Sequence, residues 1–133
     1  MGSVLLSHQA PGKQPAGATL HLTPESTWLE QRLLDVYRPE TFAEEGFVHC
    51  TDGETLVLEV ANRYYKDDPR PFLLLEIDLD AVSAPAVYED EDRLYPHVYG
   101  PIELHAVRQV RRVERAADGT FTAIGAPVPE HLP

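Results

Sequence analysis

The chain has 133 residues, of which 43% are apolar and 25% are charged. These proportions are ordinary for a soluble globular protein, and the length suits about one domain. Its 11 Lys and Arg against 22 Asp and Glu give a net charge of -11, which excludes a general surface for DNA or RNA phosphates. The single cysteine, Cys50, excludes an internal disulfide and a metal site built from several cysteines.

Residues 1–17 mix Pro, Gly and Gln without a hydrophobic period, so we expect a flexible N-terminal arm. A single domain is expected over 18–124, followed by a Pro-rich peripheral tail over 125–133. No apolar run approaches the ~18 residues of a membrane-spanning helix, and residues 3–6 are too short for the core of an export signal. These features predict a cytoplasmic protein without a membrane partner.

The first elements expected are a strand over 18–22, which alternates apolar and polar side chains, and a short helix over 26–34. Thr23 suits the N-cap of that helix, and Pro24 suits its first position. The side chains predicted to face inward from the helix are Trp28, Leu29 and Leu33.

A short buried strand over 46–50 is expected to lead into the most distinct helix, 53–65. Thr51 and Glu54 have the spacing of a capping box at its start. The following segment 72–78 is a continuous apolar run, which predicts a strand buried on both faces. The apolar face of the helix is predicted to hold Leu56, Val57, Val60, Ala61 and Tyr64.

The second half of the chain is expected to be mostly strands. Two prolines in 95–102 forbid a regular helix there and indicate an extended loop. Segment 103–115 suits a strand or a helix, and we favour a strand because valine is frequent and 102–107 alternates. A turn at 118–119 then predicts a hairpin into 120–124. Early helices followed by short strands predict an α+β fold with a split or two-part sheet.

Three histidine-bearing segments hold the candidate chemistry. His21 lies between two leucines on the first expected strand, where one backbone hydrogen bond would satisfy a merely structural histidine. His49 precedes the expected start of a helix, a position that favours bound anions and lowers the pKa of a nearby thiol. Cys50 is therefore a candidate nucleophile with His49 or His97 as its base. The alternative for Cys50 is a small buried hydrophobic side chain.

His97 lies in a stiff segment, since prolines on both sides restrict the backbone and Gly100 permits close approach of a ligand. Tyr95 and Tyr99 flank it with hydroxyl groups. Such rigidity suits a positioned acid, base or substrate clamp. The alternative is a connecting loop whose aromatic side chains fill the core. The histidines lack the short spacings of a zinc site, so no metal is assigned. A metal-dependent hydrolase is a third alternative, which requires the fold to bring His21, His49 and His97 together.

Together these segments resemble the bacterial family called domain of unknown function 952. The specific motifs are GFVHCT at 46–51 and PHVYGP at 96–101, supported by ANRYY at 61–65 and LEID at 75–78. The likeness runs over about 20–113. Members of that family resemble compact α+β domains related in fold to ADP-ribosyltransferases, which bind NAD in a cleft between two small sheets.

The resemblance implies roles for the three histidines. His21 matches the histidine that holds the nicotinamide ribose in ADP-ribosyltransferases, and His49 matches the second motif residue, which lines the nicotinamide pocket. His97 would border the same cleft. Many of those enzymes also have a catalytic Glu, but no motif places one in this chain. Glu103 is the nearest carboxylate after His97.

The leading hypothesis is a transferase-like enzyme of unknown substrate that binds an anionic or nucleotide-like small molecule, with NAD as the candidate cofactor. The residues predicted to be catalytic are His21, His49 and His97, and those predicted to bind the ligand are His21, Thr51, Tyr99, Cys50 and Trp28. The alternative is a non-catalytic binding module that retains the fold, and the missing Glu favours it. The stretch 76–92 holds seven carboxylates and no Lys or Arg, and it is expected beside the mouth of the cleft, where it would favour a cationic partner or repel nucleic acid.

Overall fold

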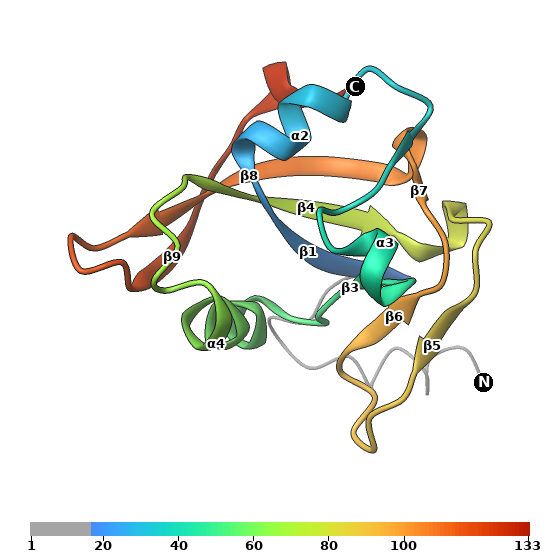
Figure 1. The fold of residues 1–133 in the computed structure, drawn as a ribbon, viewed down its shortest axis with the longest axis horizontal. Helices are drawn as coiled ribbons and strands as arrows, with labels where there is room; N and C mark the ends of the chain where they lie inside the picture. The colour runs from blue at the N-terminus through green and yellow to red at the C-terminus, as the bar shows by residue number, and fades with distance from the viewer. Residues whose placement is uncertain (1–16) are drawn as a thin grey trace, which may run out of the picture.

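The computed structural model describes residues 17–133, so the predicted arm lies outside it except for Gly17 (Figure 1). The α+β fold that the sequence predicts is confirmed over this range. The strands are β1 (Ala18–Pro24), β2 (Val36–Tyr37), β3 (Val48–His49), β4 (Phe72–Asp78), β5 (Ala86–Tyr88), β6 (Pro96–Val98), β7 (Ile102–Glu103), β8 (Val107–Arg115) and β9 (Phe121–Pro127). The helices are α2 (Glu25–Gln31), α3 (Phe42–Glu45) and α4 (Glu54–Tyr64), with 3-10 turns η1 (Leu79–Ala81), η2 (Leu104–Ala106) and η3 (Pro129–His131).

The main sheet has the strand order β1-β4-β8-β9, and each neighbouring pair is antiparallel. Two small sheets, β2-β7 and β3-β6-β5, lie apart from it in hydrogen bonding. A β-bridge between Leu20 and Thr51 connects the outer edge of β1 to the segment that follows β3. Strand β1 is therefore where the main sheet meets the small sheet β3-β6-β5, and a side chain on β1 can reach both sheets.

Strand β4 is buried on both faces, as its apolar run predicts. Leu73, Leu75 and Ile77 face the larger hydrophobic core, which also holds Trp28 and Tyr37. On the opposite face, β4 side chains contact α4 in a second core, whose buried members are Leu20, Leu22, Val57, Ala61, Phe72, Leu74 and Phe121. The sheet thus separates two apolar layers, with α4 covering one face (Figure 1).

The side chains of β1 alternate, as in any strand. Leu20 and Leu22 enter the α4 core, so Thr19, His21 and Thr23 face the other side of the sheet. All five are buried. A buried polar face must find hydrogen-bond partners, and those of His21 form the site described below.

Helix α2 is shorter than predicted, because it ends at Gln31 and not at residue 34. Leu29 is 43% exposed and Leu33 is 76% exposed, so the prediction that they face inward is wrong. Trp28 is fully buried, as predicted. The strand also continues through Pro24, which pairs with Phe72, so Thr23 is not an N-cap.

The start of α4 also differs from the sequence prediction. Gly53, with φ of +117°, occupies the N-cap, and no side chain caps this helix. Thr51 does not form a capping box because its backbone N–H and C=O both bond to Leu20, at 2.8 and 3.0 Å. Tyr64, predicted on the buried face, is 67% exposed.

The C-terminal segment, expected as a peripheral Pro-rich tail, contacts the rest of the domain at several points. Strand β9 extends to Pro127, and Val128 is 3% exposed. The backbone carbonyl of His131 accepts a 2.8 Å hydrogen bond from the Trp28 indole. This segment therefore closes one end of the larger core.

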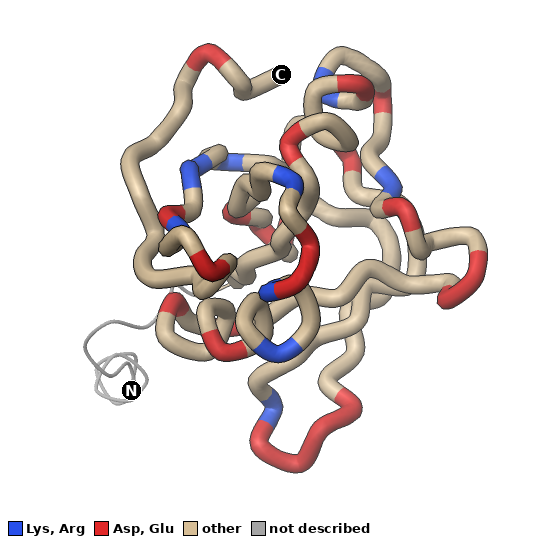
Figure 2. Tube along the Cα trace, turned by 60° about the vertical axis from the view of Figure 1, so that its left-hand side comes forward, with Lys and Arg blue, Asp and Glu red and all other residues tan. Residues whose placement is uncertain are grey.

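The acidic run lies partly on a protruding hairpin. Four of its carboxylates, at 89–92, lie on the connection between β5 and β6, and Figure 2 shows a continuous acidic stretch at a protruding hairpin. Over residues 17–133, no helix has the length and apolar character that a membrane crossing requires.

Candidate functional site

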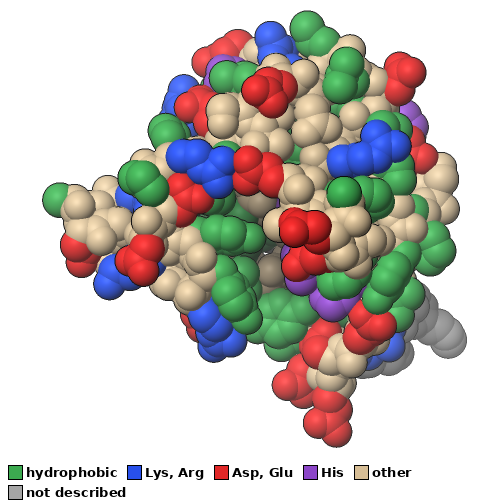
Figure 3. Space-filling model, in the orientation of Figure 1, with side chains coloured by type: hydrophobic (Ala, Val, Ile, Leu, Met, Phe, Trp, Pro, Cys, Tyr) green, Lys and Arg blue, Asp and Glu red, His purple; other side chains and the backbone are tan. Residues whose placement is uncertain are grey.

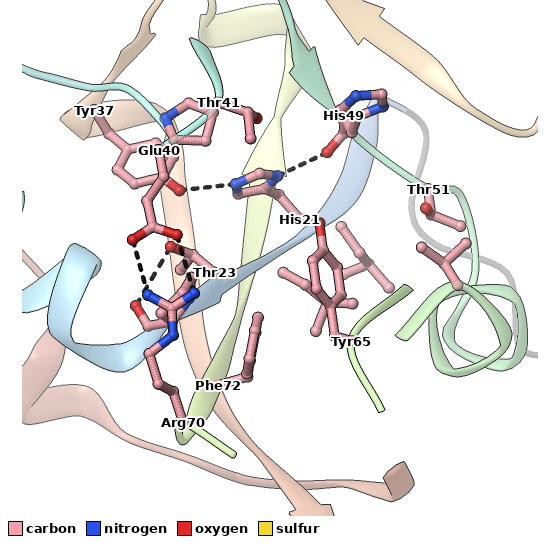
Figure 4. Close-up of a pocket in the computed structure, with 15 residues that line it drawn as sticks. His21, Thr23, Tyr37, Glu40, Thr41, His49, Thr51, Tyr65, Arg70 and Phe72 are labelled. Carbon is pink, nitrogen blue, oxygen red and sulfur yellow. Dashed lines mark hydrogen bonds and ion pairs between the residues drawn. The ribbon is translucent and has the colours of Figure 1, made fainter. Parts of the chain in front are cut away.

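A cavity of about 90 Å³ lies between β1, the connection that follows β2, and the end of α4. Its mouth is the hollow near the middle of the face seen in Figure 3. Its lining mixes polar side chains, among them His21, Glu40 and Arg70, with apolar and aromatic ones such as Phe72 (Figure 4). The polar and aromatic residues that line it are His21, Thr23, Tyr37, Glu40, Thr41, His49, Thr51, Tyr65, Arg70 and Phe72.

His21 is fixed at the inner wall by both ring nitrogens. Nδ1 lies 2.7 Å from the backbone oxygen of His49, and Nε2 lies 2.8 Å from the Tyr37 hydroxyl. Because a carbonyl oxygen can only accept a hydrogen bond, Nδ1 of His21 carries the ring proton and donates a hydrogen bond to the His49 carbonyl. Nε2 is then the acceptor, and the Tyr37 hydroxyl donates to it. The geometry therefore selects one neutral tautomer of His21.

Burial keeps this imidazole uncharged. His21 is 5% exposed, and desolvation lowers its pKa to about 4, despite the opposing effect of the hydrogen bond to His49. Tyr37 is fully buried, which raises the pKa of its phenol. At neutral pH the pair is a chain of neutral hydrogen bonds, in which His21 is an acceptor and not a ready base.

Charge at the site comes from Arg70 and two carboxylates. The guanidinium of Arg70 contacts Glu40 through Nη1 and Nη2, at 2.8 and 3.1 Å. It also contacts Asp68, which lies two residues before it in the chain, through Nε and Nη2. These bonds lower the pKa of Glu40 and of Asp68. Both carboxylates are therefore ionised at neutral pH.

His49 is close to the cavity through its backbone and not its ring. Figure 4 shows the carbonyl directed at His21 and the imidazole turned away. The ring is 52% exposed and lies 3.0 Å from Glu45. The predicted role of His49 as a side chain lining the site is therefore met only by its carbonyl oxygen.

His97 belongs to an aromatic surface cluster next to the site. It lies directly opposite His49 in the β3–β6 pair, with ring centroids 5.2 Å apart, and Phe47 stacks on it at 4.2 Å. Its Nδ1 and the Tyr99 hydroxyl each lie 2.7 Å from Glu89. Neither His97 nor Tyr99 lines the cavity wall. His49 joins this cluster to His21, but the three imidazoles do not share one pocket.

Cys50 and Trp28 lie in the larger core and not in the cavity wall. Cys50 is 2% exposed, and burial raises the pKa of its thiol, which favours the alternative of a small buried hydrophobic side chain over the nucleophile hypothesis. Trp28 packs edge-on against Tyr37, with ring centroids 5.7 Å apart, and so supports the site from behind. Thr51 does line the cavity, as predicted.

The carboxylate in the cavity wall is Glu40 and not Glu103, which accepts hydrogen bonds from Ser83. Of the described residues, those that line the cavity include none from the acidic run 76–92. Over residues 17–133, no three His, Cys, Asp or Glu side chains form a group that could hold a metal ion.

Sequence reasoning missed Tyr37, Glu40, Tyr65 and Arg70 as site residues. Tyr37 and Glu40 lie between the expected helix 26–34 and the expected strand 46–50, where the sequence predicts no element because a two-residue strand has no periodicity to detect. Arg70 lies between Pro69 and Pro71, directly after the expected helix 53–65, and prolines at that place indicate only the end of a helix. The one signal available was the sequence DDPR at 67–70, in which a carboxylate two residues before an arginine can fix its side chain.

A comparison of the sequence with models of known protein families shows to which family the chain belongs. The family model described as "Protein of unknown function (DUF952)" matches residues 22–110. The chain belongs to the DUF952 family. The match includes both motifs that carry the resemblance, at 46–51 and 96–101, so this DUF952 chain has them on β3 and on β6 with the turn that follows it.

Among solved structures, the DUF952 chain is similar to protein CC0527 from Caulobacter crescentus. The TM-score is 0.65 at 17% sequence identity, and the match covers 86% of this chain and 97% of that one. A double mutant of CC0527 matches with the same values. At this identity the likeness shows a shared fold. No curated protein matches the DUF952 chain in sequence.

Proposed function

We propose that the chain is a transferase-like protein that binds a nucleotide-like small molecule, with one ring-sized group of that molecule in the cavity beside His21. One observation supports this proposal above the others. His21 is the residue that resembles the ribose-binding histidine of ADP-ribosyltransferases, and it lies in a cavity wall in a single neutral tautomer.

NAD is the first candidate ligand, and the cavity limits how it can fit. A volume of about 90 Å³ is below the ~300–1,000 Å³ of pockets that enclose drug-sized ligands. It suits the nicotinamide or its ribose, while the rest of the molecule lies outside the mouth. Bound NAD would supply an ADP-ribosyl group for transfer.

The residues of the chain then have distinct tasks. Nε2 of His21 accepts a hydrogen bond from a ligand hydroxyl in place of the Tyr37 hydroxyl. The apolar side chains of the lining, which include Leu22 and Phe72, exclude water from the ring. Glu40 is the carboxylate of the cavity wall, and it would accept a proton from an attacking hydroxyl once its bonds to Arg70 are broken.

A non-catalytic binding module is the second candidate. It is favoured because both nitrogens of His21 are engaged within the protein and Glu40 is paired with Arg70. Among the described residues that line the cavity, neither His21 nor Glu40 therefore offers an unengaged base. The two candidates share the ligand and differ only in chemistry.

Calorimetric titration with NAD, ADP-ribose and nicotinamide tests the proposal, with His21→Asn as the site variant. His105→Asn is the control, because His105 is exposed on η2 and away from the cavity. We expect NAD to bind to the wild type and to the control and to bind more weakly to His21→Asn. No heat with any of the three ligands would refute the proposal. If NAD binds, release of free nicotinamide separates the transferase from the binding module.

A further inference from the structure

Arg70 is held at the cavity mouth by its own segment of the chain. Asp68 accepts hydrogen bonds from the Arg70 backbone N–H at 3.0 Å, from Nε at 3.1 Å and from Nη2 at 2.8 Å. The backbone carbonyl of Arg70 accepts a further hydrogen bond of 2.8 Å from Arg115. The guanidinium is therefore positioned before any contact with the opposite side of the mouth is made.

Glu40 approaches the remaining edge of that guanidinium from across the mouth. Its two carboxylate oxygens pair with Nη1 and Nη2 at 2.8 and 3.1 Å (Figure 4). Two parallel bonds of this kind are the arrangement in which arginine recognises a carboxylate or a phosphate group. Glu40 thus takes the place that an anionic group of a ligand would take.

We propose that the Nη1–Nη2 edge of Arg70 is an anion-binding site, occupied in this structure by Glu40, and that the ligand of the cavity carries a phosphate or carboxylate group that displaces Glu40. This inference rests on the proposed function, because Arg70, Glu40 and His21 line the same cavity. It adds the chemical class of the ligand and a residue that selects it.

The exchange is feasible because the contact that it breaks is exposed. The side chain of Glu40 is 49% exposed and that of Arg70 is 42% exposed, so water solvates the carboxylate once it is displaced. Exposed ion pairs of this kind contribute little to stability. Asp68, which is 23% exposed, stays bonded to Nε throughout. An arriving anion therefore replaces one bidentate partner with another.

The alternative is that Glu40 and Arg70 simply join two loops across the mouth. Substituting Glu40 separates the two interpretations, because a joining contact predicts lower stability and no gain in anion binding. Glu54 provides a matched control. It is 48% exposed and pairs with Arg111 at 3.1 Å, but it does not line the cavity. Glu54→Gln removes the same charge at a distance from the proposed site.

The experiment is a titration with inorganic phosphate, and in a separate arm with acetate, followed by the NMR signal of the Arg70 Nε–H. In the wild type we expect this signal to shift with saturation. Glu40→Gln should bind phosphate up to about fivefold more tightly, which corresponds to an exposed ion pair of about 1 kcal/mol. Glu54→Gln should match the wild type, and Arg70→Lys should lose most of the affinity. The arm with the tighter binding identifies phosphate or carboxylate.

Any one of three phosphate results would overturn the inference: no shift of the Arg70 signal in the wild type, equal affinity in the wild type and Glu40→Gln, or undiminished affinity in Arg70→Lys. The first of these needs no variant, so an unstable variant does not prevent the test. A parallel titration with NAD distinguishes this inference from the proposed function. Phosphate binding without NAD binding supports the anion site alone, whereas equal NAD binding by the wild type, Glu40→Gln and Arg70→Lys refutes it and leaves the proposed function standing.

Discussion

The Tyr37 hydroxyl and Nε2 of His21 lie 2.8 Å apart, and neither side chain is more than 5% exposed. Tyr37 comes from the two-residue strand β2, and His21 comes from the edge strand of the main sheet. Their hydrogen bond therefore links a small sheet to the large one through the interior. Its strength and its protonation state can both be measured.

Tyr37→Phe should destabilise the protein by about 1–3 kcal/mol, because it leaves the buried acceptor Nε2 of His21 without a donor. Urea unfolding measures the change. Tyr64→Phe is the control, since Tyr64 is 67% exposed, and it should stay within about 0.5 kcal/mol of the wild type. Equal stability of the two variants would mean that the hydrogen bond contributes nothing.

Stability should fall as the pH falls through the range set by His21. Burial lowers the pKa of His21 from 6.5 to about 4, so between these values the unfolded chain binds the proton and the folded protein does not. Acid therefore favours unfolding, and the contribution of His21 amounts to about 3 kcal/mol at pH 4 relative to pH 7. Urea unfolding of the wild type and of His21→Asn across this range measures it. A difference between the two proteins that does not change with pH would contradict the assignment.

His49→Ala should leave the cavity intact. The residue supplies only its backbone oxygen to His21, while its ring lies 52% exposed beside Glu45. The ¹⁵N chemical shifts of the His21 ring, which report its tautomer, should therefore match those of the wild type. Loss of that tautomer in His49→Ala would show that the ring supports the site.

Cys50 should be inert towards thiol reagents in the native protein. It is 2% exposed, and burial raises the pKa of its thiol, so the thiolate needed for reaction is scarce. In denaturant one thiol per chain should react at once. Fast labelling of the native protein at pH 8 would revive the nucleophile hypothesis that the sequence suggested.

Gly119→Ala should cost more stability than Gly46→Ala. Both glycines have positive φ, +96° and +80°, so an alanine at either position costs about 1–2 kcal/mol in backbone strain. A Cβ at Gly119 would also lie 2.3 Å from the Lys66 carbonyl oxygen, whereas at Gly46 it meets nothing within 4 Å. Thermal unfolding of the two variants compares the costs. Equal losses would show that the turn at Gly119 moves to admit the Cβ.

The sequence predicted the parts of the fold whose burial pattern is strong and local. Because the run 72–78 is continuously apolar, a strand with alternate side chains on two buried faces is the conformation that buries it best. The observed strand β4 has the same bounds as the predicted one. The pattern fails where tertiary contact decides. Thr51 and Glu54 have the spacing of a capping box, but the backbone N–H and C=O of Thr51 are hydrogen-bonded to Leu20 instead.

The site was predictable only in part, for the same reason. His21 and Thr51 are found in the cavity wall, because each lies on or beside a strand that the sequence reveals. Glu40 and Arg70 come from two loops and meet only in the folded chain, 30 residues apart. The sequence also does not reveal which part of His49 faces the cavity. The ring was expected there, but the backbone carbonyl is the group that contacts His21.

The hydrogen bond from the Trp28 indole to the carbonyl of His131 gives the protein an optical reporter. Trp28 is the single tryptophan of the chain and is fully buried. The carbonyl of Leu132 is also bound, by Arg32 at 3.1 Å. Detachment of the last residues would therefore wet the indole and shift its fluorescence to the red before the sheet opens. For the same reason, docking of this segment on the domain could be followed in a fluorimeter.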